Sequence, residues 1–600
     1  MKRKLLKLLP VAAVLLTASC VDDKYDLSDI DTESRFVAKG LVVPLNMSPV
    51  LLDNIISIEE DGDIKKDESG NYFFQKKSTS PFQSEDVNVE KITIRKPADI
   101  SQTVTVAISL PSDVRTKWET YAADKTIAQI REDETLKSQI GLNDETEIIS
   151  VDVNDSKDFN MNATGIDPRI TKLNKLGIDP LSLNIDVKLN GLQAVVAGVP
   201  VTGLSIDLPC GMTVEGITDD GSYNAAGKLS FPTLVIDGQK NIRATVTELT
   251  YNAMEADGAQ FNKNAHTFIY NKVCKVSGSA TIKIKDLKGN ATLADITNAV
   301  AATYSCNVGF SNDIVVNKFS GGIDYTIDNI AIDPVKIDNL PELLQESGTS
   351  IEIANPQLYL DINNPFFANN ITAKAGLRIV SSNNVAIPEA PGGKVLTLDE
   401  ANNKQVLSPE NKDMANQGYK WVAFSELKNL LSGEKIPETL DIKVVNPVLN
   451  ADNVINFTLG ENHPGITGNW EFYARLSLTE NSKIKYTKVW DDWGSEDLDG
   501  LTVEKATASF TVKKNVALDA ESITFTLMGE NGTDLTGTTA LQGDAKQEIS
   551  IPMEGGPVKN IKGGKLVVNL KGQGKDINKN DEIEISNLRL KVDGYYDKEF

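Results

Sequence analysis

Histidine is almost absent from this chain, which contains only His266 and His463 in 600 residues. This count nearly excludes metal sites built from several histidines and nucleophiles that a histidine activates. Phosphate-binding, dinucleotide-binding, nucleophile-elbow and zinc-protease motifs do not occur in a usable context. We therefore expect a protein that is not an enzyme and that holds no cofactor and no metal ion.

Cysteine is also scarce, and no Cys-x-x-Cys pair points to a zinc or redox motif. Cys20 belongs to the N-terminal segment described below, so Cys210, Cys274 and Cys306 remain. This odd number permits at most one disulfide. Cys274 and Cys306 flank one β-rich segment and are the better-placed pair, but three buried free thiols explain the same count equally well.

Basic residues are outnumbered, because 61 Lys and Arg stand against 84 Asp and Glu, a formal net charge of −23. A surface of this charge repels nucleic acid and anionic headgroups, so we expect no nucleic-acid partner. Aromatic residues make up only 6% of the chain, but 40% hydrophobic residues are enough to build cores. At about 100–200 residues per domain, the length allows several domains.

The N-terminal segment has the order of a secretory signal peptide. Its first seven residues include four basic ones, an interrupted apolar run covers Leu5–Leu16, and three small residues precede Cys20. The run is shorter than the roughly 20 apolar residues that a transmembrane helix needs. The order predicts a signal peptide over residues 1–19, and an ordinary secretory signal with a cysteine nearby is the alternative to a lipid attachment site.

With a cysteine directly after the small residues, the segment resembles a bacterial lipoprotein signal. That family usually has Leu three residues before the cysteine; here Thr17 stands there and Leu16 one place earlier, as in Bacteroidetes lipoproteins. Asp22 and Asp23 resemble their acidic export tag. The resemblance implies that Cys20 is lipidated and that the protein is anchored in the outer membrane, facing the cell exterior. Several acyl chains on one residue give stable anchoring.

A polar, acidic stretch follows the lipoprotein signal. Residues 20–40 are predicted to form an extended tether between the membrane and the folded body. Within it, YDLSDIDTESRF resembles the start of a group of Bacteroidales lipoproteins to which no function is assigned. The resemblance implies a surface location and no particular activity.

Alternating apolar and polar residues dominate the rest of the chain, as in Val87–Ile94 and Thr103–Leu110. A period of two places one face of a strand on a core and the other in water. Asn, Asp, Gly and Pro separate the short strands, and the helices that a parallel α/β fold needs between its strands are missing. We predict an all-β, mainly antiparallel protein of several tandem β-sandwich domains.

One longer helix is predicted in the N-terminal part, over about residues 112–140, with Ser112 as its cap. Packing across a sheet is the simplest role for this helix, and binding a partner is the alternative. The predicted order is an N-terminal β domain that contains this helix, two central β-sandwiches and a C-terminal β-sandwich. Their predicted bounds are 41–160, 161–333, 334–480 and 481–600.

A weak internal repeat lies in the third of these domains. Its copies end at Pro365 and Asn453, and each contains paired leucines, Ser-Gly, an alternating strand and Asn-Pro. Each copy is followed, after a turn, by a second predicted strand, ITAKAGLRIV at 371–380 and NWEFYARLSL at 469–478. Each copy is predicted to be a short helical turn that feeds a β-hairpin, with Asn-Pro at an edge or a bend. The stretch NPQLYLDINNPF resembles the LEA/water-stress (WHy) family, which implies a β-sandwich here.

The strongest candidate for a ligand site is the aromatic and acidic run from residue 486 to residue 500. Aromatic faces beside carboxylates suit a sugar, because a ring covers its apolar face while the acids accept hydrogen bonds from its hydroxyls. The alternative is a loop whose tryptophans plug the edge of a sandwich. Catalysis is not indicated, since any acid-rich loop supplies two carboxylates. The candidate residues are Tyr486, Trp490, Asp491, Asp492 and Trp493.

The loop at residues 574–584, GKDINKNDEIE, resembles an EF-hand-like calcium loop in its alternating polar positions. It has Asp581 where that loop has Gly, and Asn587 where that loop closes with Glu. A β-turn explains the sequence better, so no metal site is predicted.

Taken together, these features predict a non-catalytic cell-surface lipoprotein that binds a glycan or a protein, or that serves as a structural component of the outer membrane. A fimbrial or adhesin subunit that assembles by strand addition is the alternative. It requires a removable N-terminal strand, for which Arg35 is a conceivable trypsin-like cleavage site. A surface glycan-degrading enzyme is the least favoured function, because histidine and aromatic residues are so few.

Overall fold

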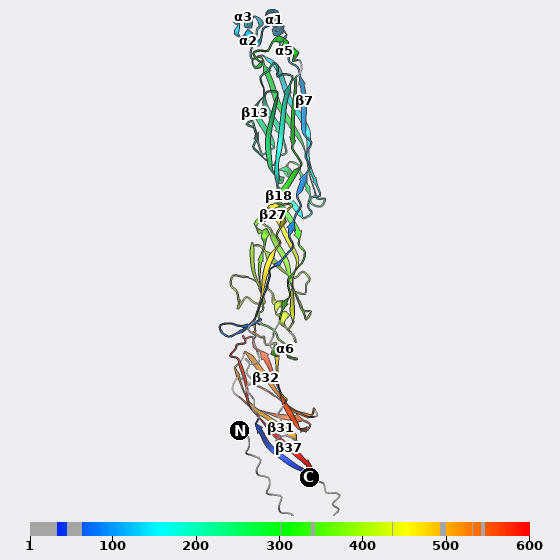
Figure 1. Cartoon of the computed structure of the whole chain (residues 1–600), viewed down its shortest axis with the longest axis vertical. Coiled ribbons are helices and arrows are strands. Elements are labelled where there is room, and N and C mark those ends of the chain that lie inside the picture. The colour runs from blue at the N-terminus through cyan, green and yellow to red at the C-terminus, as the bar shows by residue number, and fades with distance from the viewer. Residues whose placement is uncertain are drawn as a thin grey trace, which may run out of the picture.

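The computed structural model shows an elongated molecule built from antiparallel strands (Figure 1). Strands far outnumber helices, which confirms the predicted all-β fold class. Among the described strand pairs, only β25 (Asn402–Ser408) with β26 (Lys420–Ala423) is parallel. The structure describes residues 33–44, 63–299, 302–337, 342–434, 436–491, 500–515, 517–530, 532–541 and 547–599.

The distal body, residues 87–326, forms the upper part of Figure 1. Its longest ladder joins β8 (Glu147–Thr164) to β16 (Thr267–Lys283), and β9 (Ile170–Asn190) pairs with β14, β17 and β18. The other elements are β5 (Val87–Asn88), β6 (Ile92–Ile94), β7 (Ile100–Val106), β10 (Val199–Asp207), β11 (Met212–Glu215), β12 (Ser222–Tyr223), β13 (Lys228–Ile236), β14 (Gln239–Thr250), α4 (Tyr251–Ala256), β15 (Gln260–Asn262), η3 (Ile284–Asp286), β17 (Ala302–Phe310) and β18 (Ile314–Thr326).

Short helices cover the far tip of the distal body (Figure 1). The prediction of one helix over 112–140 is wrong in its continuity. Thr126 is extended and caps a new helix by accepting a hydrogen bond from the Gln129 N–H, and Asp133 is extended and caps the next by accepting from the Thr135 N–H. These local caps compete with continuation of the preceding helix. The tip helices are α1 (Ser112–Ala122), the longest that the structure describes, α2 (Ile127–Glu132), α3 (Glu134–Ile140) and α5 (Leu293–Asn298).

The middle body combines residues 63–83 with residues 330–478. One of its sheets has the order β2-β3-β29-β21-β25-β26, and β27 with β22 belongs to the sheet that continues from the distal body through β18. The elements are β2 (Ile64–Lys66), β3 (Tyr72–Lys77), β4 (Phe82–Gln83), β19 (Ile330–Ala331), β20 (Val335–Lys336), α6 (Glu342–Gln345), β21 (Gln357–Asn363), η4 (Pro365–Asn369), β22 (Thr372–Ser381), β23 (Ala386–Ile387), β24 (Lys394–Leu398), η5 (Ser425–Leu431), β27 (Thr439–Thr458), β28 (Asn462–His463) and β29 (Thr467–Arg475).

The two copies of the internal repeat pair with each other rather than forming hairpins. Strand β21 of the first copy pairs with β29, which follows the second copy, and β22 pairs with β27. The hairpin prediction is therefore wrong. Each strand of one copy pairs with a strand of the other, so both copies contribute to the same two sheets. The predicted bend is confirmed at Asn446, which has φ +50° next to Pro447 at a break in the β22–β27 register.

The proximal body contains the C-terminal strands and, as its end strand, β1 (Glu33–Pro44). Strand β1 pairs with β37 from Glu33↔Glu599 to Pro44↔Arg589. The tether predicted over residues 20–40 is thus wrong from residue 33 onward, because apolar side chains there favour a strand. The other strands are β30 (Lys483–Trp490), β31 (Leu501–Asn515), β32 (Leu518–Gly529), β33 (Asp534–Ala540), β34 (Gln547–Gly555), β35 (Val558–Lys559), β36 (Ile561–Gly572) and β37 (Glu582–Glu599).

The domains are nested rather than tandem. The predicted boundary after residue 160 falls inside β8, and the predicted domain 41–160 is divided among all three bodies. The chain enters at the proximal body, passes through the middle body to the distal tip, and then returns through the middle body to the proximal body. Alternation in a sequence identifies strands but does not identify their partners, so the nesting was not predicted.

The loop at 574–584 forms part of the contact between the middle and proximal bodies. Its Asp576 pairs with Arg475 at 2.5 Å, and the Asn578 amide donates to the Asn71 side chain at 2.9 Å. Asp576 and Asn578, two of the side chains that resemble calcium ligands, thus bind protein groups. The described residues contain no cluster of three or more His, Cys, Asp or Glu suited to a metal.

Cys210, Cys274 and Cys306 are free and buried. The pairing of Cys274 with Cys306 is therefore wrong, and the alternative of three buried thiols is confirmed. Burial raises the pKa of both Cys274 and Cys306 to about 12, so their thiols resist ionisation. As to membrane crossing, none of the described helices is long and apolar enough for it.

Candidate functional site

The predicted aromatic run is only partly within the described residues. Tyr486 and Trp490 lie on β30, four positions apart and therefore on one face of that strand, and Asp491 follows them and is exposed. Asp492 and Trp493 lie outside the described residues. The structure thus brings two of the three predicted aromatic side chains together.

Both described aromatic side chains pack against the hydrophobic core and are half-buried. Burial raises the pKa of the Tyr486 hydroxyl, and the nearby Glu346 carboxylate adds to this effect. Trp490 stands opposite Gly564 in the β30–β36 ladder. This packing is what the plugging interpretation expects of Trp490, whereas sugar binding by the run stays a prediction.

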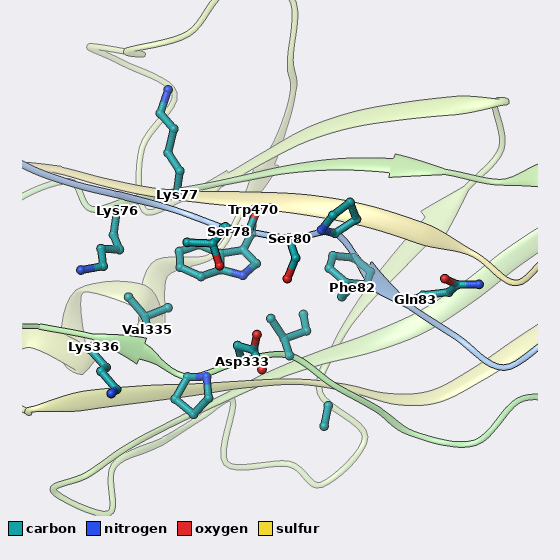
Figure 2. Close-up of a pocket in the computed structure, with 15 residues that line it drawn as sticks. Lys76, Lys77, Ser78, Ser80, Phe82, Gln83, Asp333, Val335, Lys336 and Trp470 are labelled. Atoms are coloured by element: carbon teal, nitrogen blue, oxygen red, sulfur yellow. Dashed lines mark hydrogen bonds between the residues drawn. The ribbon is translucent and has the colours of Figure 1, made fainter.

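A pocket of about 350 Å³ lies in the middle body (Figure 2). Two segments line it, residues 76–83 and residues 331–336, and Trp470 lies between them. Its volume falls within the range of roughly 300–1,000 Å³ that is typical of small-molecule sites. We call it the Trp470 pocket.

Two interrupted strands create the Trp470 pocket. On one side β3 ends at Lys77 and β4 begins at Phe82, and on the other side β19 ends at Ala331 and β20 begins at Val335. Pro81 and Pro334 lie in these two breaks. Proline has no N–H to donate to a ladder, which explains why both strands break at the same level.

Trp470, on β29, is only 7% exposed. Its backbone N–H donates to the Ser78 hydroxyl at 3.2 Å, and its carbonyl accepts from the Ser78 N–H at 2.9 Å. Phe82 packs on neighbouring Gly468, where an added Cβ would lie 2.5 Å from the ring. These contacts fix the β29 backbone at Trp470 beside the pocket, and the indole Nε1–H donates to none of the described residues.

The charged groups around the Trp470 pocket balance one another. The ammonium group of Lys76 lies 2.8 Å from an Asp63 oxygen, and that of Lys77 lies 3.3 Å from a Glu471 oxygen. Figure 2 shows Lys77 directed away from the pocket. The two remaining charged lining residues, Lys336 and Asp333, are exposed and form no ion pair with any described residue.

Sequence reasoning missed the Trp470 pocket. NWEFYARLSL was correctly predicted to be a strand, but nothing in that stretch marks Trp470 as lining a pocket. The segments 76–83 and 331–336 are far apart in the chain and meet only through the nesting of the bodies. The one usable signal was a proline within an otherwise extended segment, at Pro81 and again at Pro334.

Comparisons with known proteins are sparse. No protein-family model matches the chain, and no curated protein is significantly similar to it. A solved structure described as a "putative secreted protein" from Parabacteroides distasonis ATCC 8503 covers 46% of this chain and 89% of its own, at 14% identity and a TM-score of 0.31. The Faustovirus major capsid protein covers 97% of this chain and 92% of its own, at 6% identity and a TM-score of 0.10. At these scores neither likeness bears on fold or function, and the LEA/WHy resemblance stays a prediction.

Proposed function

We propose that this protein is a non-catalytic, lipid-anchored surface protein that holds a ligand-binding body away from the outer membrane. The observation that carries this proposal is the position of the chain ends within the body. Glu33 and Glu599 are register partners in the proximal body, whereas the helices α1, α2 and α3 cover the opposite end of the long axis (Figure 1). A chain attached at Cys20 is therefore attached at one end of an elongated molecule.

The length of the connection to the lipid supports this orientation. Twelve residues, 21–32, separate Cys20 from Glu33. Even fully extended, twelve residues span at most about 40 Å. The proximal body consequently stays near the membrane, and the middle and distal bodies extend from it toward the surroundings of the cell.

The surroundings of the few histidines support the non-catalytic part of the proposal. His463 Nε2 lies 2.8 Å from the Thr458 carbonyl oxygen, which fixes that nitrogen as the donor, and the His463 ring packs 4.4 Å from the Phe457 ring. His266 occupies a position with φ +54° in the turn before β16. Both positions suit structural roles.

Brief protease treatment of intact cells tests the surface location. We expect proteinase K to digest the protein in intact cells, because an anchored body that faces the exterior is within its reach. A periplasmic protein measured in the same cells serves as the control and is expected to stay intact. Protection of this protein until the outer membrane is permeabilised would contradict the proposed location.

A second candidate function, assembly by strand addition, is favoured by the state of β1. This strand lies at the end of its sheet, and Val37 and Val42 are 64% and 53% exposed. An exposed apolar edge strand is a site to which a strand of another chain can add. Arg35 lies within β1, ion-paired with Asp597 at 3.1 Å, so cleavage after Arg35 would leave most of β1 on β37.

Charges on β1 test this second candidate. If strands add to β1, the purified protein should form oligomers at high concentration, and Val37→Lys with Val42→Lys should convert them to monomers, because charged side chains on an edge block pairing. Light scattering measures the mass of the wild-type protein and of the variant. Lysine at exposed Tyr121, on the distal tip, is the matched control. A wild-type chain that stays monomeric at high concentration rules the candidate out.

A further inference from the structure

We infer that the Trp470 pocket binds a neutral saccharide. The inference rests on the proposed function for the source of the ligand, which a surface-exposed body would meet outside the cell. Its structural basis has three parts. The Trp470 indole N–H donates to none of the described residues, the charges around the pocket balance one another, and the pocket lies between two interrupted strands.

The indole N–H of Trp470 points to a ligand. The Trp470 side chain is mostly buried and its Nε1–H donates to none of the described residues, but Nε1 is not among the buried polar atoms without a partner, so this atom is open to the pocket. An accessible N–H is hydrogen-bonded to water until a ligand supplies an acceptor. In Figure 2 the indole faces the space between the two lining segments, so an acceptor in the pocket would complete the hydrogen bonding of this side chain.

The balance of charge selects against an ionic ligand. Lys76 and Lys77 already have carboxylate partners, and one unpaired cation, Lys336, lines the pocket together with one unpaired anion, Asp333. An anionic ligand would gain from Lys336 but would lose by proximity to Asp333, and a cation would meet the reverse. A neutral ligand has no such conflict.

The polar lining selects a ligand rich in hydroxyl groups. Ser80 and Asp333 lie on opposite sides of the pocket beside Trp470 (Figure 2), and Gln83 lies at one end. Together these groups offer both donors and acceptors, which hydroxyls can satisfy because each both donates and accepts. The Trp470 and Phe82 rings supply apolar surface for the carbon-bound hydrogens of a sugar.

An extended peptide fits this site less well than a sugar does. Peptides that bind at sheet edges do so by continuing the ladder of main-chain hydrogen bonds. At this pocket both edges are interrupted, at 78–81 and at 332–334, and each interruption contains a proline. The pocket therefore lacks the continuous edge that strand addition needs.

Binding to immobilised oligosaccharides tests the inference. The full chain, purified as the lipoprotein in detergent, is applied to neutral oligosaccharides of hexose and N-acetylhexosamine and to acidic ones carrying uronic acid or sulfate. We expect binding to a subset of the neutral probes. Asp333→Ala and Trp470→Phe should each weaken it about tenfold, because each removes one hydrogen bond to the ligand. Trp421→Phe, a change of the same kind on β26 of the middle body and outside the pocket, should leave it unchanged.

Three results would overturn the inference: no neutral probe binds, only acidic probes bind and Lys336→Ala abolishes that binding, or Asp333→Ala and Trp470→Phe both leave binding unchanged. Because Asp333 is exposed, its variant should keep the wild-type melting temperature and remain informative even if Trp470→Phe unfolds. A chain that is lipidated and digested on intact cells but binds no neutral probe would overturn this inference alone. A chain that binds sugar but is protected inside the cell would overturn the proposed location alone.

Discussion

Replacing Cys20 with serine is expected to abolish fatty-acid attachment and to remove the protein from the outer membrane. The thiol is the attachment atom that the lipoprotein resemblance implies, and serine offers no thioether. A single acyl chain gives only marginal membrane binding, whereas several chains on one residue give stable anchoring. The effect should therefore be close to all-or-none, measured by labelling with a radioactive fatty acid and by fractionation of the membranes.

The matched control for this substitution is Cys210→Ser, which changes a buried thiol in the distal body and should leave both label and location unchanged. A Cys20→Ser chain that still incorporates the fatty acid would refute the lipoprotein interpretation. So would a wild-type chain that takes up no label while residues 1–19 are removed.

Asp167→Ala is expected to lower the free energy of unfolding by about 3 kcal/mol. This is the lower end of the range for breaking a buried ion pair, because the Arg169 side chain is about one-third exposed. The Asp167 side chain is 1% exposed and accepts hydrogen bonds from the Arg169 Nε at 2.7 Å and from the Glu90 N–H at 3.0 Å. Arg169 also lies over the Tyr325 ring, 4.6 Å from its centre. Alanine would leave these donors without an acceptor. Urea unfolding measures the loss.

The pH dependence of stability gives a second test of Asp167. Burial would raise the pKa of this carboxyl, but the Arg169 guanidinium and the backbone N–H donors outweigh burial and hold the pKa below its ordinary value. A carboxyl with a lowered folded-state pKa stabilises the fold above its unfolded-state pKa, about 4, and this contribution is lost as the pH falls through the folded-state value. The difference in unfolding free energy between wild type and Asp167→Ala should therefore be largest at pH 7 and should shrink below about pH 4.

Asp333→Ala is the matched control, because Asp333 is exposed and forms no ion pair with any described residue. It should unfold within about 0.5 kcal/mol of the wild-type free energy. Two results would contradict the role given to the buried carboxylate. One is an equal loss of unfolding free energy in Asp167→Ala and Asp333→Ala. The other is a difference between wild type and Asp167→Ala that does not change with pH.

The fold class could be predicted because alternation depends on local sequence, whereas the order of the bodies could not. Strand β1 pairs with β37 at the opposite end of the chain, and no local signal links them. The repeat was visible as two similar segments, but its crosswise pairing depends on which sheet buries which face. The helix at 112–140 was placed correctly and was broken by caps at Thr126 and Asp133, whose side chains compete locally with the helix.

The functional features were harder to predict for the same reason. Nothing in the sequence GIDP at residues 165–168 shows that Asp167 is buried against Arg169. Trp470 looked like one more strand residue, and its pocket exists only because two distant segments break beside it. The run at 486–493 was conspicuous in composition, yet Tyr486 and Trp490 pack against the core.

The orientation of the anchored molecule is the central claim, and fluorescence transfer to the membrane tests it most directly. Tyr121→Cys, 53% exposed on the distal tip, and Val489→Cys, 41% exposed on the proximal body, are each labelled with a donor dye. Cys210, Cys274 and Cys306 are buried and should stay unlabelled. With the lipidated protein in vesicles that contain an acceptor lipid, we predict strong transfer from position 489 and little from position 121. Equal transfer from both positions, or stronger transfer from position 121, would contradict the account.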